Sequence, residues 1–283
     1  MNKINLIAEI GWNHLGDINL AKRMIKEASE NGATHVKTQV FNETYLKPGP
    51  WDTDGRREIY KKAQPTYDQL MEMKKHCEIH EVKFMASPMS LRDAKMYLTV
   101  TNELIKIPGF ESRNKELLQF AFDNFQTVII STGTSSVKEI EDTLSSLDRF
   151  NELYYSKLVL LHCVSSYPCD PKTANLQRIR SLQFLQSINY GNPPEQVGFS
   201  DHIMGVESVK VALEFDIDWV EKHFTVDRNL PGRDNKFAIL PHELKDLSDY
   251  IKLREDMLVD HGDDYQECEK LVRDIQTGRF DKK

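Results

Sequence analysis

Short apolar runs recur along the chain, and each is followed by a polar or glycine-containing turn and then by a stretch with helical periodicity. The runs are continuous rather than alternating, which is typical of parallel strands buried on both faces. They lie at 4–10, 35–40, 82–87, 103–107, 127–131, 158–164, 197–200 and 218–224. The helical patterns lie near 18–31, 66–80, 90–99, 113–124, 136–148, 174–188, 205–215 and 241–258.

Eight strand–helix units in about 250 residues are what a (β/α)8 barrel requires, so the pattern predicts a single-domain TIM barrel over residues 1–258. A doubly wound open sheet is the alternative, but the first run is not followed by the G-x-G-x-x-G turn of a dinucleotide-binding fold. We expect the polar insertion at 41–65 to form a partly ordered lid on the face of the barrel where the carboxyl ends of the strands lie. Residues 259–283 are expected to be an acidic, partly helical tail rather than a second domain.

Charge and composition narrow the class of partner. A net charge of -7 disfavours nonspecific binding of nucleic acid, which requires a basic face. No apolar run reaches the eighteen residues of a membrane span, and the first residues are too short in their apolar part for a secretory signal. The four cysteines show no C-x-x-C spacing, so we expect reduced thiols in a cytoplasmic protein without nucleic-acid or membrane partners.

In a (β/α)8 barrel the active site lies at the carboxyl ends of the strands, so polar residues there are the candidates. Those at or just beyond the ends of the predicted strands are Glu9, Lys37, Gln39, Lys106, Ser131, Thr132, Ser165, Ser166, Tyr167, Ser200, Asp201, His202, Lys222 and His223.

Two histidines follow adjacent predicted strands. His202 and His223 should lie close enough for both imidazoles to bind one ion. Two nitrogen ligands, with water and a carboxylate completing the set, suit Mn, Co, Zn or Fe better than Mg. The alternative is that each histidine only forms hydrogen bonds within the core.

Charged residues inside apolar strands suggest a binding site for an anion. Lys37 and Lys106 are interpreted as fixed countercharges for a phosphate or carboxylate, supported by the hydroxyls of Ser131 and Ser200, although either lysine alone could extend to solvent at the rim. Glu9 could move a proton or form a structural ion pair. The stretch STGTSS at 131–136 presents a serine to phosphate or caps the next helix.

The motifs IAEIGWNHLGD, HVKTQVF, FMASP, IISTG, LLHCVSSYP, VGFSDH, EKHFT and RNLPGRD, in this order and spacing, cover nearly the whole chain. The set resembles the N-acetylneuraminate (sialic acid) synthase family. The resemblance implies a (β/α)8 barrel that condenses phosphoenolpyruvate with an open-chain aldose, commonly N-acetylmannosamine. The products would be a 2-keto-3-deoxy sugar acid and phosphate, as in surface-glycan biosynthesis.

The resemblance also implies roles for single residues. His202 and His223 would bind a divalent metal ion, with Mn favoured over Mg or Co. Glu9 would be the catalytic carboxylate, and Lys37 and Lys106 would orient phosphoenolpyruvate and neutralise its charge. Further phosphoenolpyruvate contacts would be Ser131, Ser165 and Ser200, and the sugar side would include Gln39, Glu111, Tyr167 and Asp234.

The sequence departs from the family pattern in three ways. Gly109 replaces a serine that usually contacts phosphoenolpyruvate, and Arg233 adds a cation beside the sugar site. We also expect no antifreeze-like module of the kind that many relatives carry. Either Arg233 or residues 41–65 would take over its sugar contact, or the acceptor is recognised differently, or the module is supplied separately. A homodimer is expected.

Two other functions stay open from the sequence. The first is a synthase for another 3-deoxy-ulosonic acid, of the legionaminic, pseudaminic or octulosonic type. The second is a catalytically silent barrel that binds a sugar or phosphate ligand.

Overall fold

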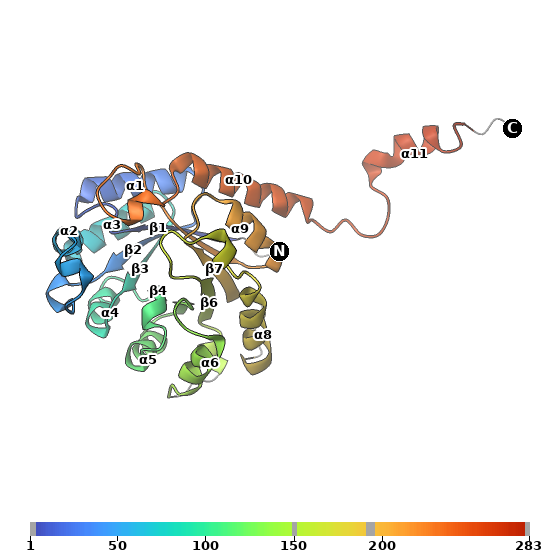
Figure 1. Cartoon of the computed structure of the whole chain (residues 1–283). Coiled ribbons are helices and arrows are strands. Elements are labelled where there is room, and N and C mark those ends of the chain that lie inside the picture. Colours follow the sequence, from blue (N-terminus) through green and yellow to red (C-terminus); the bar gives the residue numbers. More distant parts are fainter. Residues whose placement is uncertain (1–3, 149–151, 191–195, 281–283) are drawn as a thin grey trace.

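Eight parallel strands close into a barrel in the computed structural model, which describes residues 4–148, 152–190 and 196–280 (Figure 1). The strands pair in chain order, and the last pairs with the first. They are β1 (Asn5–Gly11), β2 (His35–Val40), β3 (Lys83–Pro88), β4 (Leu104–Ile107), β5 (Thr127–Ser131), β6 (Leu158–Cys163), β7 (Val197–Asp201) and β8 (Trp219–His223). The predicted (β/α)8 barrel is confirmed.

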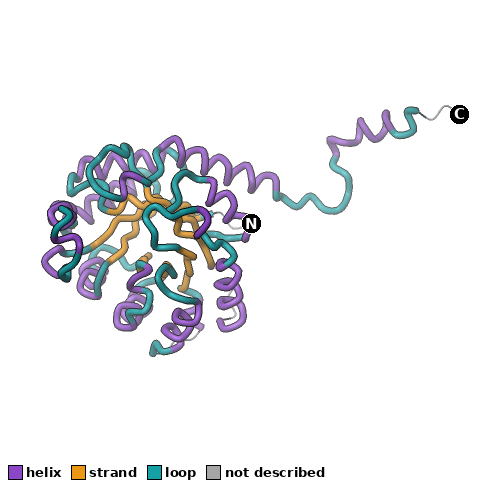
Figure 2. The backbone as a smooth tube through the Cα atoms, viewed as in Figure 1, coloured by secondary structure: helices purple, strands orange, loops and turns teal. Residues whose placement is uncertain are grey.

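Helices connect successive strands and form the outer layer of the barrel (Figure 2). They are α1 (Ile18–Glu30), α3 (Tyr67–Ile79), α4 (Leu91–Leu98), α5 (Lys115–Asn124), α6 (Val137–Ser145), α7 (Glu152–Tyr155), α8 (Arg178–Tyr190), α9 (Glu207–Ala212) and α10 (Pro241–Met257). Ser136 caps α6 in a capping box with Glu139, so the hydroxyl of Ser131 is not used for the cap.

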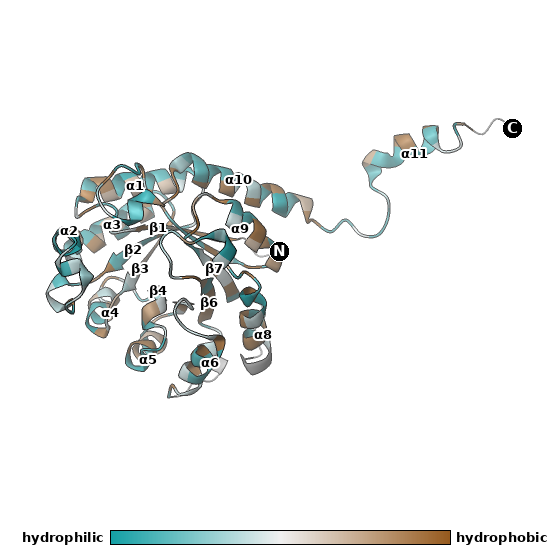
Figure 3. Ribbon diagram, in the orientation of Figure 1, coloured by the Kyte–Doolittle hydropathy of each residue, from teal (hydrophilic) through white to brown (hydrophobic). Residues whose placement is uncertain are grey.

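Side chains that alternate in direction along the strands form three layers. One apolar layer lies between barrel and helices, a second lies inside the barrel, and a polar layer lies above the second. Hydrophobic and hydrophilic residues alternate along the helices around the barrel (Figure 3). One face of β1, with Leu6 and Ala8, packs in the large core between barrel and helices. On the opposite face Ile7 belongs to a smaller cluster inside the barrel, together with Met85 and Leu161. Glu9, two residues beyond Ile7, therefore points into the barrel above an apolar floor.

Two segments lie outside the repeating pattern. The insertion at 41–65 contains η1 (Glu43–Tyr45), η2 (Pro50–Asp52) and α2 (Arg56–Ala63). After α10 the chain runs away from the barrel to η8 (Glu267–Glu269) and α11 (Lys270–Gln276) (Figure 1). All four cysteines are free. Within the described ranges, none of the helices combines the length and the apolar character that crossing a membrane would need.

Candidate active site

A cavity of about 290 Å³ opens at the carboxyl ends of the strands. All of the residues to which the family resemblance gave a role line it except Glu111 and Ser200, and the strand-end candidates Thr132, Ser166, Asp201 and Lys222 do not line it. The predicted residues that line the cavity are Glu9, Lys37, Gln39, Lys106, Ser131, Ser165, Tyr167, His202, His223, Arg233 and Asp234. Glu111 lies in the 3-10 turn η3 (Gly109–Glu111), where its carboxylate accepts a hydrogen bond from Asn114.

Two lysines and two carboxylates form a buried charge network at the base of the cavity. The Lys37 ammonium lies 2.7 Å from Glu9 Oε2 and 3.6 Å from Glu221 Oε2, and the Lys106 ammonium lies 3.3 Å from Glu221 Oε1. The exposed fraction is 2% for the Lys37 side chain and 8% for that of Lys106. The alternative in which these lysines extend to solvent is therefore wrong.

Glu221 is the member of this network that the sequence analysis missed. Its carboxylate contacts both lysines and accepts a 2.9 Å hydrogen bond from Ser200, so Ser200 supports the network although it does not itself line the cavity. The available signal was its spacing, because residues two apart on a strand point to the same side and His223 was already a candidate.

Electrostatics give the two carboxylates opposite pKa shifts. Burial raises the pKa of Glu9 and the negative charge of Glu221 adds to this effect, while Lys37 opposes it. Burial alone would raise the pKa of Glu221, but Lys106 and Lys37 together outweigh it and lower this pKa to about 2. Glu221 is thus a fixed anion, whereas Glu9 is the carboxylate whose environment favours holding a proton.

His202 and His223 face each other, with ring centroids 5.4 Å apart and an interplanar angle of 51°. His202 Nδ1 donates to the Val164 carbonyl at 2.9 Å, which leaves the lone pair on Nε2. Burial lowers the pKa of His202 to about 4. Burial also lowers the pKa of His223 well below its usual value, and the neighbouring His202 adds to this effect. Both imidazoles are neutral at neutral pH.

This pair fits the nitrogen donors of a divalent metal site. His223 Nδ1 is buried without a hydrogen bond in the described residues, and a hydrogen bond to a carbonyl orients the His202 ring, as is common for metal-binding histidines. Within the same residues no cluster of three or more His, Cys, Asp or Glu side chains has metal-binding geometry, so the expected carboxylate ligand is not found. Water or a substrate oxygen would have to complete the coordination.

Aromatic and polar residues complete the lining of the cavity. The centroids of the Tyr167 and His202 rings lie 4.1 Å apart, and the guanidinium of the exposed Arg233 lies 5.5 Å from the centroid of the Tyr167 ring. Gln39 donates to Glu9 at 3.0 Å. Burial, reinforced by the charge of Glu9, raises the pKa of Asp234 to about 7.

The insertion and two residues outside it add contacts that were not predicted one by one. Arg56 and Tyr60 of α2 line the cavity, in agreement with the position expected for a lid, and Trp12 packs edge-on against Tyr60. Cys163 also lines the cavity, 3.8 Å from His202. Burial raises the pKa of its thiol to about 11, which favours the protonated form at neutral pH.

The glycine at position 109 has a packing reason. A Cβ atom there would lie 2.7 Å from the carbonyl oxygen of Gly133, and a Cβ atom on Gly133 would lie 2.3 Å from Ser165 Oγ. A serine at 109 therefore does not fit unless the backbone moves. Ser131 Oγ is buried without a hydrogen-bond partner among the described residues, which leaves its hydroxyl for a ligand.

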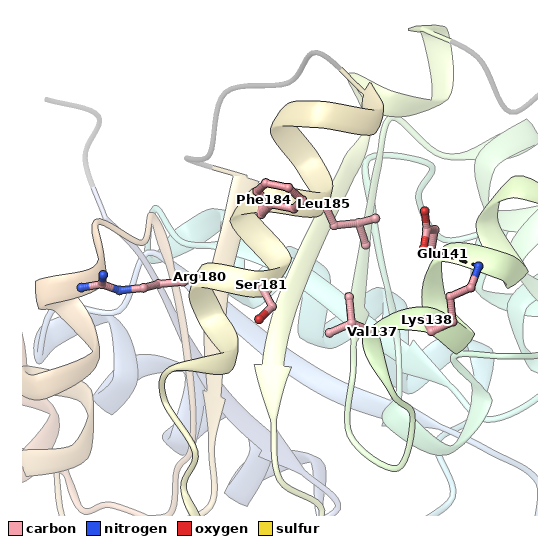
Figure 4. A pocket seen from close by; sticks show the side chains of 7 residues that line it. All are labelled: Val137, Lys138, Glu141, Arg180, Ser181, Phe184 and Leu185. Carbon is pink, nitrogen blue, oxygen red and sulfur yellow. Dashed lines mark ion pairs between the residues drawn. The ribbon is translucent and has the colours of Figure 1, made fainter.

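A second hollow lies on the outside of the barrel between α6 and α8, where Val137, Phe184 and Leu185 flank it (Figure 4). Its Lys138 is paired with Glu141 and Asp142. None of the predicted site residues lines this hollow, and none of its lining residues belongs to a strand end, where barrel chemistry occurs. We therefore assign the site to the barrel mouth.

Fold and site together define a TIM-barrel protein with a buried, charged small-molecule pocket at the carboxyl ends of its strands. The chain belongs to the NeuB family, whose model matches residues 24–262. It is 32% identical over 263 residues to the N,N'-diacetyllegionaminic acid synthase of Campylobacter jejuni, covering 89% of this chain and 76% of that protein. Identity to the N-acetylneuraminate-9-phosphate synthase of Drosophila melanogaster is 31%, with 89% and 68% covered.

A solved structure is similar over nearly the full length. The sialic acid synthetase of Leptospira borgpetersenii, in complex with citrate, superimposes with a TM-score of 0.82 at 31% identity, covering 99% of this chain and 94% of that one. The chain is thus similar to synthases of sialic and legionaminic acids.

Proposed function

We propose that this protein is a synthase that condenses phosphoenolpyruvate with an open-chain N-acyl amino sugar of the N-acetylmannosamine type. The products are a 2-keto-3-deoxy nonulosonic acid and inorganic phosphate. The observation that carries the proposal is the mouth of the barrel itself, where Lys37 and Lys106 share one cavity with the neutral pair His202 and His223. The names of the similar synthases support the same reaction class.

The buried lysines suit a trianionic substrate. Lys37 and Lys106 are held by Glu9 and Glu221, and they would bind the carboxylate and phosphate of phosphoenolpyruvate while Ser131 donates its unused hydroxyl. Fixed charges of this kind need no rearrangement as the reaction proceeds, so they stabilise charge that develops on the phosphate as it leaves.

The bond changes balance with one water molecule. C3 of phosphoenolpyruvate forms a carbon–carbon bond to the aldehyde carbon, whose oxygen takes a proton and becomes a hydroxyl. The C2–C3 double bond opens as C3 reacts, and water adds to C2 with loss of one proton. The bond between C2 and the phosphate oxygen then breaks, the remaining hydroxyl proton passes to the leaving phosphate, and C2 becomes the ketone carbon. Glu9 lies beside Lys37 with a raised pKa, which suits a group that carries one of these protons.

His202 and His223 would hold a divalent cation, which we expect to be Mn²⁺. When bound, such an ion supplies Lewis acidity toward the aldehyde oxygen or a bound water. Tyr167 and Asp234 line the cavity next to the histidines and Gln39 lines it beside Glu9, and these three residues would orient the sugar.

The direct test is phosphate release from phosphoenolpyruvate with Mn²⁺ and a panel of aldoses. We expect release with N-acetylmannosamine, and a stronger response to a diacetylated or phosphorylated relative would reassign the acceptor. His223→Ala should abolish turnover while phosphoenolpyruvate still binds. No release with any aldose would contradict the proposal and favour a binding-only barrel.

A matched pair of serine variants tests the anion site. Ser131→Ala removes a hydroxyl without a protein partner, so stability should be nearly unchanged while phosphoenolpyruvate affinity falls about 10-fold. Ser112→Ala is the control, because the Ser112 hydroxyl donates to the Gly109 carbonyl at 2.7 Å and lies outside the cavity lining. It should cost about 1 kcal/mol of stability and leave the affinity unchanged.

A further inference from the structure

Two charged residues flank the histidine pair on the outer side of the barrel. Alternation along β7 and β8 places Ser200, Glu221 and His223 toward the cavity, and Asp201 and Lys222 toward the helices. Asp201 and Lys222 are direct cross-strand partners, and the Lys222 ammonium lies 2.9 Å from Asp201 Oδ2. The exposed fractions of the two side chains are 0% and 2%, so the ion pair is fully buried.

The same pair also binds the backbone that follows His202. Asp201 Oδ1 accepts from the Ile203 amide at 2.9 Å, and Lys222 donates to the Ile203 carbonyl. Ser208, at the start of α9, donates to the second oxygen of Asp201. His202 therefore lies between two residues that are both fixed to Lys222, which itself immediately precedes His223.

Stability alone does not explain this arrangement. A buried ion pair costs desolvation, and neutral residues of similar volume are often as stable or more so. The hydrogen bonds of Asp201 and Lys222 instead connect the end of β8 to the turn after β7. Such a connection restricts how far the two imidazoles can move apart.

We propose that Asp201 and Lys222 are positioning residues that fix the spacing of His202 and His223. Neither side chain lines the cavity, and both form hydrogen bonds with the backbone of Ile203, the residue that follows His202. The inference deepens the proposed function and rests on it for the identity of the bound ion. It assigns a role to the middle residue in each of the segments SDH and EKH.

The test uses the full chain and Co²⁺ as the probe, without substrates. The double variant Asp201→Asn with Lys222→Met keeps an acceptor for the Ile203 amide and leaves no unpaired buried charge. We expect its thermal midpoint to stay near that of the wild type, while Co²⁺ affinity falls about 10- to 100-fold, the range found when groups that orient metal-binding histidines are lost. The NMR signals of the two imidazoles should shift or broaden. Wild-type affinity and unchanged signals in the folded variant would overturn the proposal.

A control and a second variant make the result decisive. Lys22→Met with Glu72→Gln removes an ion pair between α1 and α3 and should change neither readout. If the first variant does not fold, Ser208→Ala carries the test, with an expected loss of about 3-fold in Co²⁺ affinity, comparable to one hydrogen bond. An unchanged affinity there would overturn the proposal. If wild-type protein binds no Co²⁺, the metal part of the proposed function fails, and the imidazole signals alone decide on the positioning pair.

Discussion

Replacing Glu221 by glutamine is the most direct test of the charge network. The carboxylate lies 3.6 Å from the Lys37 ammonium and 3.3 Å from that of Lys106, whereas Glu9 contacts only Lys37. Glu221→Gln therefore leaves one buried ammonium without a countercharge. Breaking a buried pair costs about 3–5 kcal/mol, and the cavity beside Lys106 admits water, so we expect about 3 kcal/mol.

Thermal unfolding measures this loss. At about 2 °C per kcal/mol for a chain of this size, the midpoint should fall by about 6 °C. Phosphoenolpyruvate should restore part of the loss, because its negative charge replaces that of Glu221 and a ligand stabilises the folded state that binds it. Glu72→Gln, at an exposed ion pair with Lys22, is the control and should shift the midpoint by no more than about 1 °C.

The pH dependence follows from the lowered pKa of Glu221, about 2 against a usual 4.5. A carboxylate with a lowered pKa contributes its full stability above the unfolded value and loses it as pH falls toward the folded value. The difference in the free energy of unfolding between wild type and Glu221→Gln should thus be constant between about pH 6 and about pH 8. This difference should shrink below about pH 4.5. A variant with the wild-type midpoint at pH 7 would refute the reasoning.

Three further predictions concern packing and protonation. Gly133→Ala should weaken phosphoenolpyruvate binding about 10-fold in calorimetric titrations, because the added Cβ would lie 2.3 Å from Ser165 Oγ; unchanged binding would show that Ser165 is not a ligand contact. Gly109→Ser should lower the free energy of unfolding by about 1–3 kcal/mol without a gain in phosphoenolpyruvate affinity, since the Gly133 carbonyl occupies the space; a tighter-binding variant would contradict this packing. Burial lowers the pKa of His35 to about 3. In urea unfolding, the free energy of unfolding of the wild type should therefore decrease below about pH 6.5 more steeply than that of His35→Gln, by up to about 1.4 kcal/mol per pH unit. Equal slopes would mean that His35 is charged in the folded protein.

The pattern of apolar runs was sufficient for the fold. All eight predicted strands occur within a few residues of their expected ends, because continuous apolar runs between amphipathic helices can be buried only in a covered parallel sheet. The predicted helix at 205–215 is divided, since α9 ends at Ala212 and a 3-10 turn, η6 (Leu213–Phe215), follows. The polar insertion was placed correctly at the mouth, but its helix α2 was not predicted.

Position along the strands also determined most of the site, because the carboxyl ends of parallel strands meet at one end of the barrel. Which side chains contact one another could not be predicted from the sequence in the same way. That Glu221 lies between Lys37 and Lys106, and that Asp201 pairs with Lys222 behind the histidines, depends on contacts between strands far apart in the chain. The sequence by itself determined which residues face the mouth, and only the closed barrel decided which charges lie within hydrogen-bonding distance, since barrel closure and register set those distances.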